Sequence, residues 1–263
     1  MKKYFVSACL LLTLVSQAQV KEGRIVYERV SQMPARFFSN NPELANQIPK
    51  SRTDHFELLF ANNQSLYQFL PSATEEQTTF SGGGQVIQVR GGNNDVVYYN
   101  LDKGQTVAQR DFMDNEFIVA DTIRKFAWKL TDETKKVLNY TVRKAITTRV
   151  NPSMRMSMEN GEMKRTEVLD TVPVAAWFTT DIPVSVGPDF AGQLPGAILE
   201  LDINNGQQVY KATELSPKVA VAKIKEPNKG KKVTQAEFIA ERNKLMDEMR
   251  NNMRGNGSFR IQQ

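Results

Sequence analysis

The sequence predicts a mainly β protein, an antiparallel meander that forms a curled sheet or open half-barrel and is followed by a C-terminal amphipathic helix. Short stretches with alternating apolar residues succeed one another over residues 23–215, separated by turns rich in Asn, Asp and Gly. No helical period interrupts them, and successive hairpins without intervening helices indicate antiparallel pairing. A twisted sheet of about eight to ten strands tends to curl.

Turn residues separate the expected strands of the first half. These strands span residues 23–30, 55–60, 65–70, 96–101, 105–112 and 116–120. Asn62-Asn63 and Asp102-Lys103-Gly104 each lie between two strands and predict hairpins, because Asn, Asp and Gly tolerate the backbone of tight turns. Residues 72–94 are polar and rich in Gly, which predicts a long loop or a weak hairpin.

The expected strands of the second half span residues 128–130, 137–150, 174–179, 197–203 and 207–212. The clearest hairpin signal is Asn204-Asn205-Gly206, which separates the last two. In the strand over 137–150, one face is expected to collect the apolar residues at even positions, which are Tyr140, Val142, Ile146 and Val150.

The C-terminal region differs in composition from the rest of the chain. Residues 218–232 are rich in Lys, Pro and Gly and predict a basic linker, and residues 233–263 predict a helix and tail. Thr234 and Glu237 have the spacing of a capping box, and apolar residues recur at helical spacing from Phe238 onward. We expect the helix to pack on the protein's own sheet, and docking on a membrane or a partner is the alternative.

The N-terminus has the features of an export signal. Two lysines precede an apolar stretch over residues 4–15, and small residues end at Ala18. We therefore assign residues 1–18 to a signal peptide and residues 19–217 to the β domain, and expect a periplasmic or secreted protein, with outer-membrane association as an open alternative. The single cysteine, Cys9, lies inside the apolar stretch, which favours a mature chain without disulfides over a lipoprotein.

The positive charge is concentrated at the C-terminal end. The formal net charge is +5, and residues 218–263 carry eleven Lys/Arg against five Asp/Glu. No face combines basic and aromatic residues, so nucleic acid is not the expected partner. No segment after the signal is apolar enough to cross a membrane as a helix, so an integral membrane protein is not expected either.

Residues 177–201 form the most distinctive segment, because they combine an aromatic pair, three prolines and three glycines with an apolar run. This composition requires fixed backbone geometry at many points and is typical of a structural signature. Its candidate residues are Trp177, Asp181, Pro183, Gly187, Pro188, Gly192, Leu194, Pro195 and Gly196.

This segment and two others resemble the GLPGLI family of exported Bacteroidetes proteins. The matching blocks are G-x-I-x-Y-E from Gly23, W-K-L-T-x-E-T-K from Trp128 and A-W-F-T-x-D-I-P-V-S-x-G-P from Ala176. The motif that names the family reads G-Q-L-P-G-A-I here, with Gln193 in place of a glycine and Ala197 in place of a leucine. The resemblance implies an exported, mostly β protein without an established activity.

The sequence offers few catalytic candidates. A Ser-His-Asp triad would have to use His55, the only histidine, which is expected on the wet face of a strand. Asp181, Asp189 and Glu200 lie in the signature segment, where they form either the carboxylate pair of a hydrolase or ordinary turn residues. We therefore expect no enzymatic activity and no cofactor.

A group of methionines offers a different chemistry. Met154, Met156 and Met158 occupy alternate positions, and Met163 follows. Thioether ligands favour Cu(I), so a metal site is one interpretation of this group. The other is a polar hairpin loop in which methionine serves as adaptable packing.

The leading hypothesis is a non-enzymatic exported protein that binds through the concave, apolar face of its sheet. A lipid, a peptide or an outer-membrane protein is the expected partner. A periplasmic copper-handling protein and a hydrolase with carboxylate chemistry are the alternatives.

Overall fold

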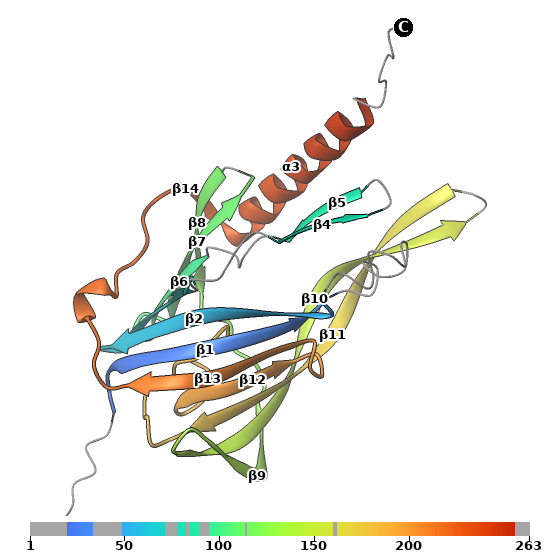
Figure 1. Cartoon of the computed structure of the whole chain (residues 1–263). Coiled ribbons are helices and arrows are strands. Elements are labelled where there is room, and N and C mark those ends of the chain that lie inside the picture. The colour runs from blue at the N-terminus through green and yellow to red at the C-terminus, as the bar shows by residue number, and fades with distance from the viewer. Residues whose placement is uncertain are drawn as a thin grey trace, which may run out of the picture.

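Most of the described chain lies in one open sheet of twelve strands (Figure 1). The computed structural model describes residues 20–33, 49–71, 78–82, 85–89, 95–113, 115–159 and 162–255. The strands of the sheet are β1 (Gly23–Gln32), β2 (Ser51–Ala61), β3 (Gln64–Phe69), β6 (Val96–Asn100), β7 (Gln105–Phe112), β8 (Asn115–Thr122), β9 (Lys129–Val137), β10 (Tyr140–Glu159), β11 (Glu162–Thr179), β12 (Ala197–Ile203), β13 (Gln208–Ser216) and β14 (Lys231–Thr234). Their spatial order is β14-β8-β7-β6-β3-β2-β1-β13-β12-β11-β10-β9. The prediction of a mainly β, unclosed sheet with a C-terminal helix is confirmed.

The remaining elements are a hairpin, a short turn of helix and the C-terminal helix. The hairpin of β4 (Thr78–Gly82) and β5 (Gln85–Val89) lies in the region expected as a long loop or weak hairpin. After β13 the chain passes through η1 (Val221–Lys223) to β14, which pairs parallel with β8, and then enters α3 (Gln235–Gly255). The sheet is therefore mixed, and β14 begins inside the segment expected as a basic linker.

Tight turns close two of the predicted hairpins. Asn62 and Asn63, between β2 and β3, have φ angles of 51° and 54°. Asn204 and Asn205, between β12 and β13, have φ angles of 59° and 51°. This left-handed backbone twists in the same sense as the flanking strands, and Asn adopts it more readily than most residues. Local chemistry is therefore sufficient to specify these hairpins.

The pairing register aligns side chains in rows across six strands. One row consists of Ala145, Ala176, Leu201, Tyr210, Arg29 and Asp54. It lies on the same side as the main core, and we call this side the inner face. The adjacent row lies on the outer face, because successive residues of a strand point to opposite sides. It consists of Lys144, Trp177, Glu200, Lys211, Glu28 and His55.

The alternation expected along β10 is interrupted. Val142 is fully buried, whereas Ile146 and Val150 are 37% and 56% exposed, so the prediction that one face collects the apolar residues of this strand is wrong. The pairing of β10 with β9 shifts register just before Ala145, which is fully buried. After this irregularity, the side chains at odd-numbered positions of β10 lie on the inner face, and that of Arg149 is one of them.

An irregular loop between β11 and β12, residues 180–196, covers the inner face, and we call it the signature loop. It adds five buried apolar side chains to the main core, which are Ile182, Val184, Val186, Phe190 and Leu194. Burial of one such side chain contributes roughly 1.5–3 kcal/mol, so the five together contribute on the order of 10 kcal/mol before the entropy of ordering the loop. The chain itself thus occupies the apolar face that the sequence suggested for a ligand.

Glycines let the signature loop lie close to the sheet. A Cβ atom at Gly196 would lie 2.0 Å from the carbonyl oxygen of Thr179. A Cβ atom at Gly187 would lie 2.7 Å from the Cβ of Ile198. Side chains at either position would push the loop away from the strands, so these signature glycines are steric requirements of the fold.

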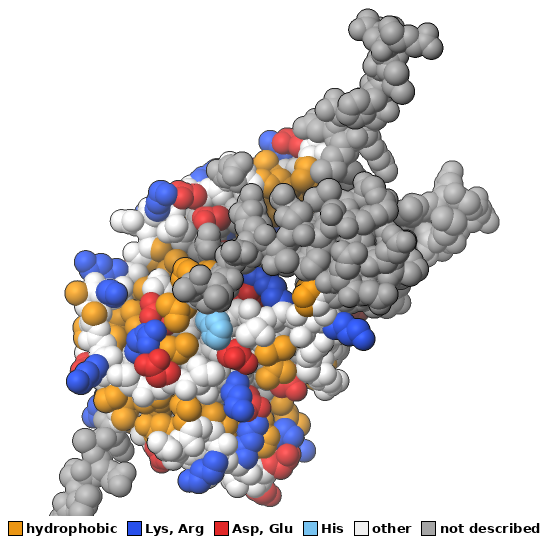
Figure 2. All heavy atoms as spheres, in the orientation of Figure 1, with side chains coloured by type: hydrophobic (Ala, Val, Ile, Leu, Met, Phe, Trp, Pro, Cys, Tyr) orange, Lys and Arg blue, Asp and Glu red, His pale blue; other side chains and the backbone are white. Residues whose placement is uncertain are grey.

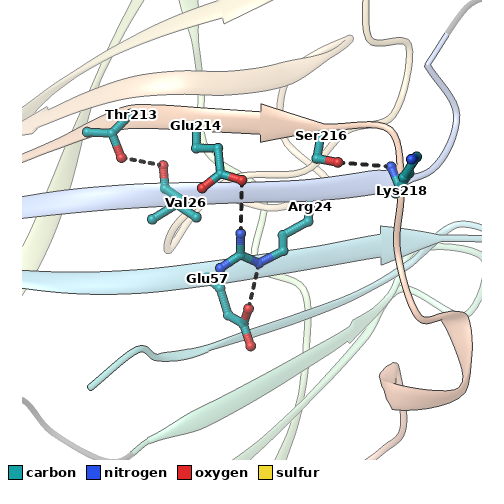
Figure 3. A network of polar contacts seen from close by, with 7 residues as sticks. All are labelled: Arg24, Val26, Glu57, Thr213, Glu214, Ser216 and Lys218. Carbon is teal, nitrogen blue, oxygen red and sulfur yellow. Dashed lines mark hydrogen bonds and ion pairs between the residues drawn. The ribbon is translucent and has the colours of Figure 1, made fainter. Parts of the chain in front are cut away.

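The outer face is polar over the central strands. Arg24 of β1 donates from Nε to Glu57 of β2 at 2.8 Å and from Nη1 to Glu214 of β13 at 3.2 Å (Figure 3). Figure 2 shows acidic and basic side chains interspersed on this side of the molecule. Toward β8 the outer face becomes apolar, and Ile224, beside η1, covers a second core formed by Leu59, Ala61, Leu66, Tyr98, Val107 and Ile118.

The helix α3 begins at the capping box that the sequence predicted. The N–H of Thr234 donates to Glu237 Oε2 at 2.7 Å, and the N–H of Glu237 donates to Thr234 Oγ1 at 3.2 Å. Phe238 is buried against Phe117 of β8 with a ring-centroid distance of 5.3 Å, so the helix packs on the protein's own sheet as expected. Within the described part of the chain, no helix is both long and apolar enough to span a membrane.

We expect Gly196→Ala to destabilise the protein more than Gly206→Ala. The methyl group at residue 196 collides with the backbone of Thr179, and we expect a loss of about 3 kcal/mol or more in the free energy of unfolding. Gly206 has a φ of +87° and open space around it, so alanine there adds only left-handed strain of about 1 kcal/mol. Urea unfolding measures both changes, and equal losses would contradict the steric role of Gly196.

Candidate functional site

Beside the signature loop, the inner face leaves a pocket of about 290 Å³. The strands β6, β7 and β8 form one wall, and the signature loop forms the opposite wall. The connection after β8, one residue of β10 and the first residue of α3 complete the lining. Its charged side chains are Arg110, Asp121, Arg124, Arg149 and Asp189, and Tyr99, Thr106, Thr122, Gln193 and Gln235 add polar groups.

Three arginines from separate elements line this pocket. Arg124 lies 3.7 Å from Asp121, measured from Nη2 to Oδ2. Arg110 of β7 lies 3.9 Å from Asp95, measured from Nε to Oδ2, which is long for an ion pair. Arg149 of β10 forms no ion pair with a carboxylate of the described residues. The pocket therefore carries positive charge that close ion pairs do not fully neutralise.

The signature loop contributes one carboxyl group, that of Asp189, whose backbone is left-handed with a φ of 59°. Tyr210 Oη donates to Asp189 Oδ2 at 3.4 Å. The side chain remains accessible from the pocket, but the surrounding protein removes much of its hydration, and this desolvation raises the pKa of Asp189. The charges of Arg149, Arg29 and Arg110 oppose the shift. Asp189 therefore holds its proton to a higher pH than an ordinary aspartate does.

An ion pair and an aromatic stack lie next to Tyr210, which contacts Asp189. Arg29 donates from Nη2 to Asp54 Oδ2 at 2.6 Å, and its guanidinium carbon lies 4.5 Å from the ring centroid of Phe56. The ring of Tyr67 stacks on Phe56 at a centroid distance of 5.1 Å. Burial raises the pKa of both Tyr67 and Tyr210, so both hydroxyl groups are available as donors at neutral pH.

Several buried donors of this region have no acceptor among the described residues. They are Nε of Arg29, Arg110 and Arg149, and Oη of Tyr67. A buried polar atom without a partner costs about 1–3 kcal/mol, and such atoms require a functional or structural explanation. Two of them, the guanidinium groups of Arg110 and Arg149, line the pocket and have the chemistry to bind a group rich in acceptor oxygens.

Gln193, which replaces a glycine of the GLPGLI motif, fixes the rim of the pocket. Its Oε1 accepts a hydrogen bond from the N–H of Phe126 at 3.2 Å, and its Nε2 donates to the carbonyl oxygen of Arg124. Phe126 and Trp128 both contact Phe190 edge to face, at centroid distances of 5.3 and 5.4 Å. The departure from the motif therefore ties the signature loop to the connection that follows β8.

A second group of motif residues lies on the outer face. Lys135 Nζ lies 4.1 Å from the ring centroid of Trp177 and 2.5 Å from Glu200 Oε1. Lys144 Nζ lies 5.6 Å from the same ring and 2.9 Å from Glu133 Oε1. Two of the blocks that carry the resemblance thus meet around Trp177, where they connect β9, β10, β11 and β12.

The remaining signature residues shape the loop. Leu194 and Pro188 are buried, and Gly192 adopts a left-handed φ of +75°. Pro183 and Pro195 are exposed. None of these side chains carries a titratable group, so their roles are conformational.

The catalytic candidates are not brought together. Asp181 is exposed and does not line the pocket, whereas Asp189 does. Glu200 is bound to Lys135 on the outer face. His55 also lies on the outer face, and its imidazole forms no hydrogen bond with another described residue. Of these candidates, only Asp189 belongs to the site.

The methionine hypothesis falls on side chains outside the described residues. The backbone places Met154, Met156 and Met158 on β10, and Met158 pairs with Met163 of β11. Among the described residues, no group of three or more His, Cys, Asp or Glu side chains can hold a metal ion. The copper site stays a prediction, as does the signal peptide over residues 1–18, which lies outside the described part of the chain together with Cys9.

The sequence reasoning missed the arginines that line the pocket and the tyrosine that binds Asp189. Arg110, Arg149 and Tyr210 lie on strands that are distant in the sequence, and the register alone brings them to one face. One local signal existed, because Arg110 and Arg149 occupy inner-face positions two and four residues after the buried Ala108 and Ala145. A charged residue in phase with buried neighbours is a candidate functional residue.

Comparison with known proteins relates part of the chain to a family and most of it to a known fold. A family model described as "Protein of unknown function (Porph_ging)" matches residues 128–200, which include the signature loop. None of the curated proteins compared with the chain matches it. A structure of PNGF-II in space group P21 has 17% sequence identity to this chain and a TM-score of 0.51. The match covers 84% of this chain and 32% of the PNGF-II chain. A second structure of PNGF-II, in space group C2, has 16% sequence identity and a TM-score of 0.49, and the match covers 83% of this chain and 32% of the PNGF-II chain. The chain thus shares a sheet-rich fold with about one third of the PNGF-II chain.

Gln193→Gly, which introduces the glycine that the GLPGLI motif has at this position, should destabilise this protein. The substitution removes the side chain that binds the backbone at Arg124 and Phe126, and we expect a loss of about 1–3 kcal/mol in the free energy of unfolding. Gln193→Ala is the control that separates the lost hydrogen bonds from the added freedom of glycine. Thermal and urea unfolding measure both, and a gain in stability for Gln193→Gly would refute the role of the amide.

Proposed function

We propose that this protein is an exported, non-enzymatic binding protein of the GLPGLI type, which takes a small polar ligand into the pocket between the signature loop and β6–β8. The observation that carries the proposal is the pocket of about 290 Å³ with three arginines, of which Arg149 has no ion pair with a described carboxylate. Its size and its convergent polar groups are typical of small-molecule sites.

The choice of a polar ligand follows from the packing of the core. A lipid or an apolar peptide requires an open apolar surface, but the signature loop fills the inner face over β1 and β2. The residues that remain accessible in the pocket are mostly charged or polar. The sequence suggested that the ligand binds to the apolar face of the sheet. We place it instead in the charged pocket beside β6, β7 and β8, on the same face of the sheet.

Export and family relationship are supported by the sequence together with the fold. The first eighteen residues have a positive start, an apolar stretch and a small-residue end, which is the composition of a signal peptide. Residues 128–200 match a family model of unknown function, and they contain two of the blocks that resemble GLPGLI proteins. We infer that the protein acts in the periplasm or outside the cell.

The absence of a catalytic role is inferred from the candidate side chains. Asp181 and Glu200 do not line the pocket with Asp189, and His55 lies on the opposite face of the sheet. A hydrolase needs a nucleophile or an activated water together with a second group that transfers the proton. The candidates identified from the sequence do not supply such a pair.

A thermal-shift screen of small polar compounds tests the proposed function. At least one compound should stabilise the wild type and Lys211→Glu, a control on the outer face, because the pocket is intact in both. The same compound should not stabilise Thr106→Trp, which fills the pocket, or Arg149→Glu, which reverses its charge. Circular dichroism confirms that the variants fold. If every compound that stabilises the wild type stabilises both pocket variants equally, the pocket is not the binding site.

A further inference from the structure

The arginines of the pocket indicate the class of ligand. Resting on the proposed function, we propose that the ligand carries an oxyanion, either a carboxylate or a phosphate, which Arg149 and Arg110 bind beside the carboxyl group of Asp189. Neither arginine belongs to a sequence motif, and the register of the sheet brings both to the pocket.

Arg149 is the first element of this site. It follows Ala145 on the inner face of β10, where an apolar residue would continue the core. Its Nε is buried and has no acceptor, and no described carboxylate lies within ion-pair distance of its guanidinium group. A guanidinium group presents a planar fork of donors that matches two oxygens of a carboxylate or phosphate. Arg149 is therefore available to a ligand rather than engaged within the fold.

Arg110 approaches the same pocket from the opposite strand wall. Its guanidinium carbon lies 5.3 Å from the ring centroid of Phe238, so the first turn of α3 helps to orient it. Its Nε is buried without a hydrogen-bond acceptor, and Asp95 stands at 3.9 Å. Arg124 differs, because its side chain is 70% exposed and already lies near Asp121. Two of the three arginines are thus positioned by packing and retain unused donors.

Asp189 makes the site sensitive to pH. An ionised carboxylate would repel an oxyanion in the same pocket, whereas a protonated carboxyl group donates a hydrogen bond to it. The charged and titratable groups that face Asp189 come from six strands and are Arg29, Tyr67, Tyr99, Arg110, Arg149 and Tyr210. All of the tyrosines are held neutral by burial, so Asp189 is the group that takes up the proton. Anion affinity should therefore rise as the pH falls.

Three probes with one carbon skeleton test this inference by isothermal titration calorimetry with the full mature chain. Glucuronate supplies a carboxylate, glucose 6-phosphate supplies a phosphate, and glucose is the neutral control. We expect at least one acidic probe to bind the wild type and Lys211→Gln, and the one that binds identifies the oxyanion. Arg149→Gln should bind it about tenfold more weakly or worse, and Arg149→Lys should recover part of the affinity, because a single ammonium replaces the charge without the fork.

The pH dependence is measured by repeating the titrations at an acidic and at an alkaline pH, because desolvation raises the pKa of Asp189. With the carboxylate probe, the wild type should bind more tightly at the lower pH, and Asp189→Asn should bind at the higher pH as tightly as at the lower. The phosphate probe itself titrates between these two conditions, so the comparison of Asp189→Asn with the wild type at each pH isolates the residue.

Three results would overturn the oxyanion site. They are equal binding of glucose and the acidic probes, equal affinity of Arg149→Gln and Lys211→Gln, and no binding of either acidic probe to the wild type at millimolar concentration. If a neutral compound from the thermal-shift screen nevertheless loses its binding in Thr106→Trp, the pocket remains the site and only the ligand class is wrong.

Discussion

The packing of the signature loop against the inner face of the sheet is the interaction on which the rest of this structure depends. An open sheet of twelve strands exposes a broad apolar face, and each Å² left in water costs roughly 25 cal/mol. Residues 180–196 cover that face with Ile182, Val186 and Phe190, and the missing side chain at Gly196 lets the loop lie against the end of β11. This packing, and not a catalytic role, explains why the segment is rich in Pro and Gly.

The same packing creates the pocket. Phe190 is held between Phe126 and Trp128, and this fixes the preceding residue, Asp189, beside Tyr210 at the edge of the apolar core. Past this point the signature loop no longer covers the inner face, and the arginines there line a pocket instead of a core. One loop therefore closes the hydrophobic interior and supplies the carboxyl group of the candidate site, so stability and binding are expected to depend on the same segment.

The local features of the fold could be predicted from the sequence, and the site largely could not. Asn204-Asn205-Gly206 specifies its hairpin and Thr234 its helix cap, because each signal acts over a few neighbouring residues. The irregularity before Ala145 and the parallel pairing of β14 depend on contacts between distant strands, and no local pattern encodes them. Asp189 was recognised as a candidate, but its arginine partners come from other strands and carry only the weak signal of a charge in phase with buried residues.

Hydrogen exchange of the native protein, followed by mass spectrometry, tests the central role of the signature loop most directly. The N–H of Ala197 donates to the carbonyl oxygen of Ile182, and the N–H of Ile198 donates to that of Val186, so the loop and β12 share hydrogen bonds. If the loop is part of the core, the hydrogen-bonded amides of the loop itself, those of Val186, Gly192 and Gly196, will exchange only with global unfolding, as slowly as those of β12. Rapid exchange of these amides while β12 remains protected would contradict the account, because the loop would then be a separable surface segment.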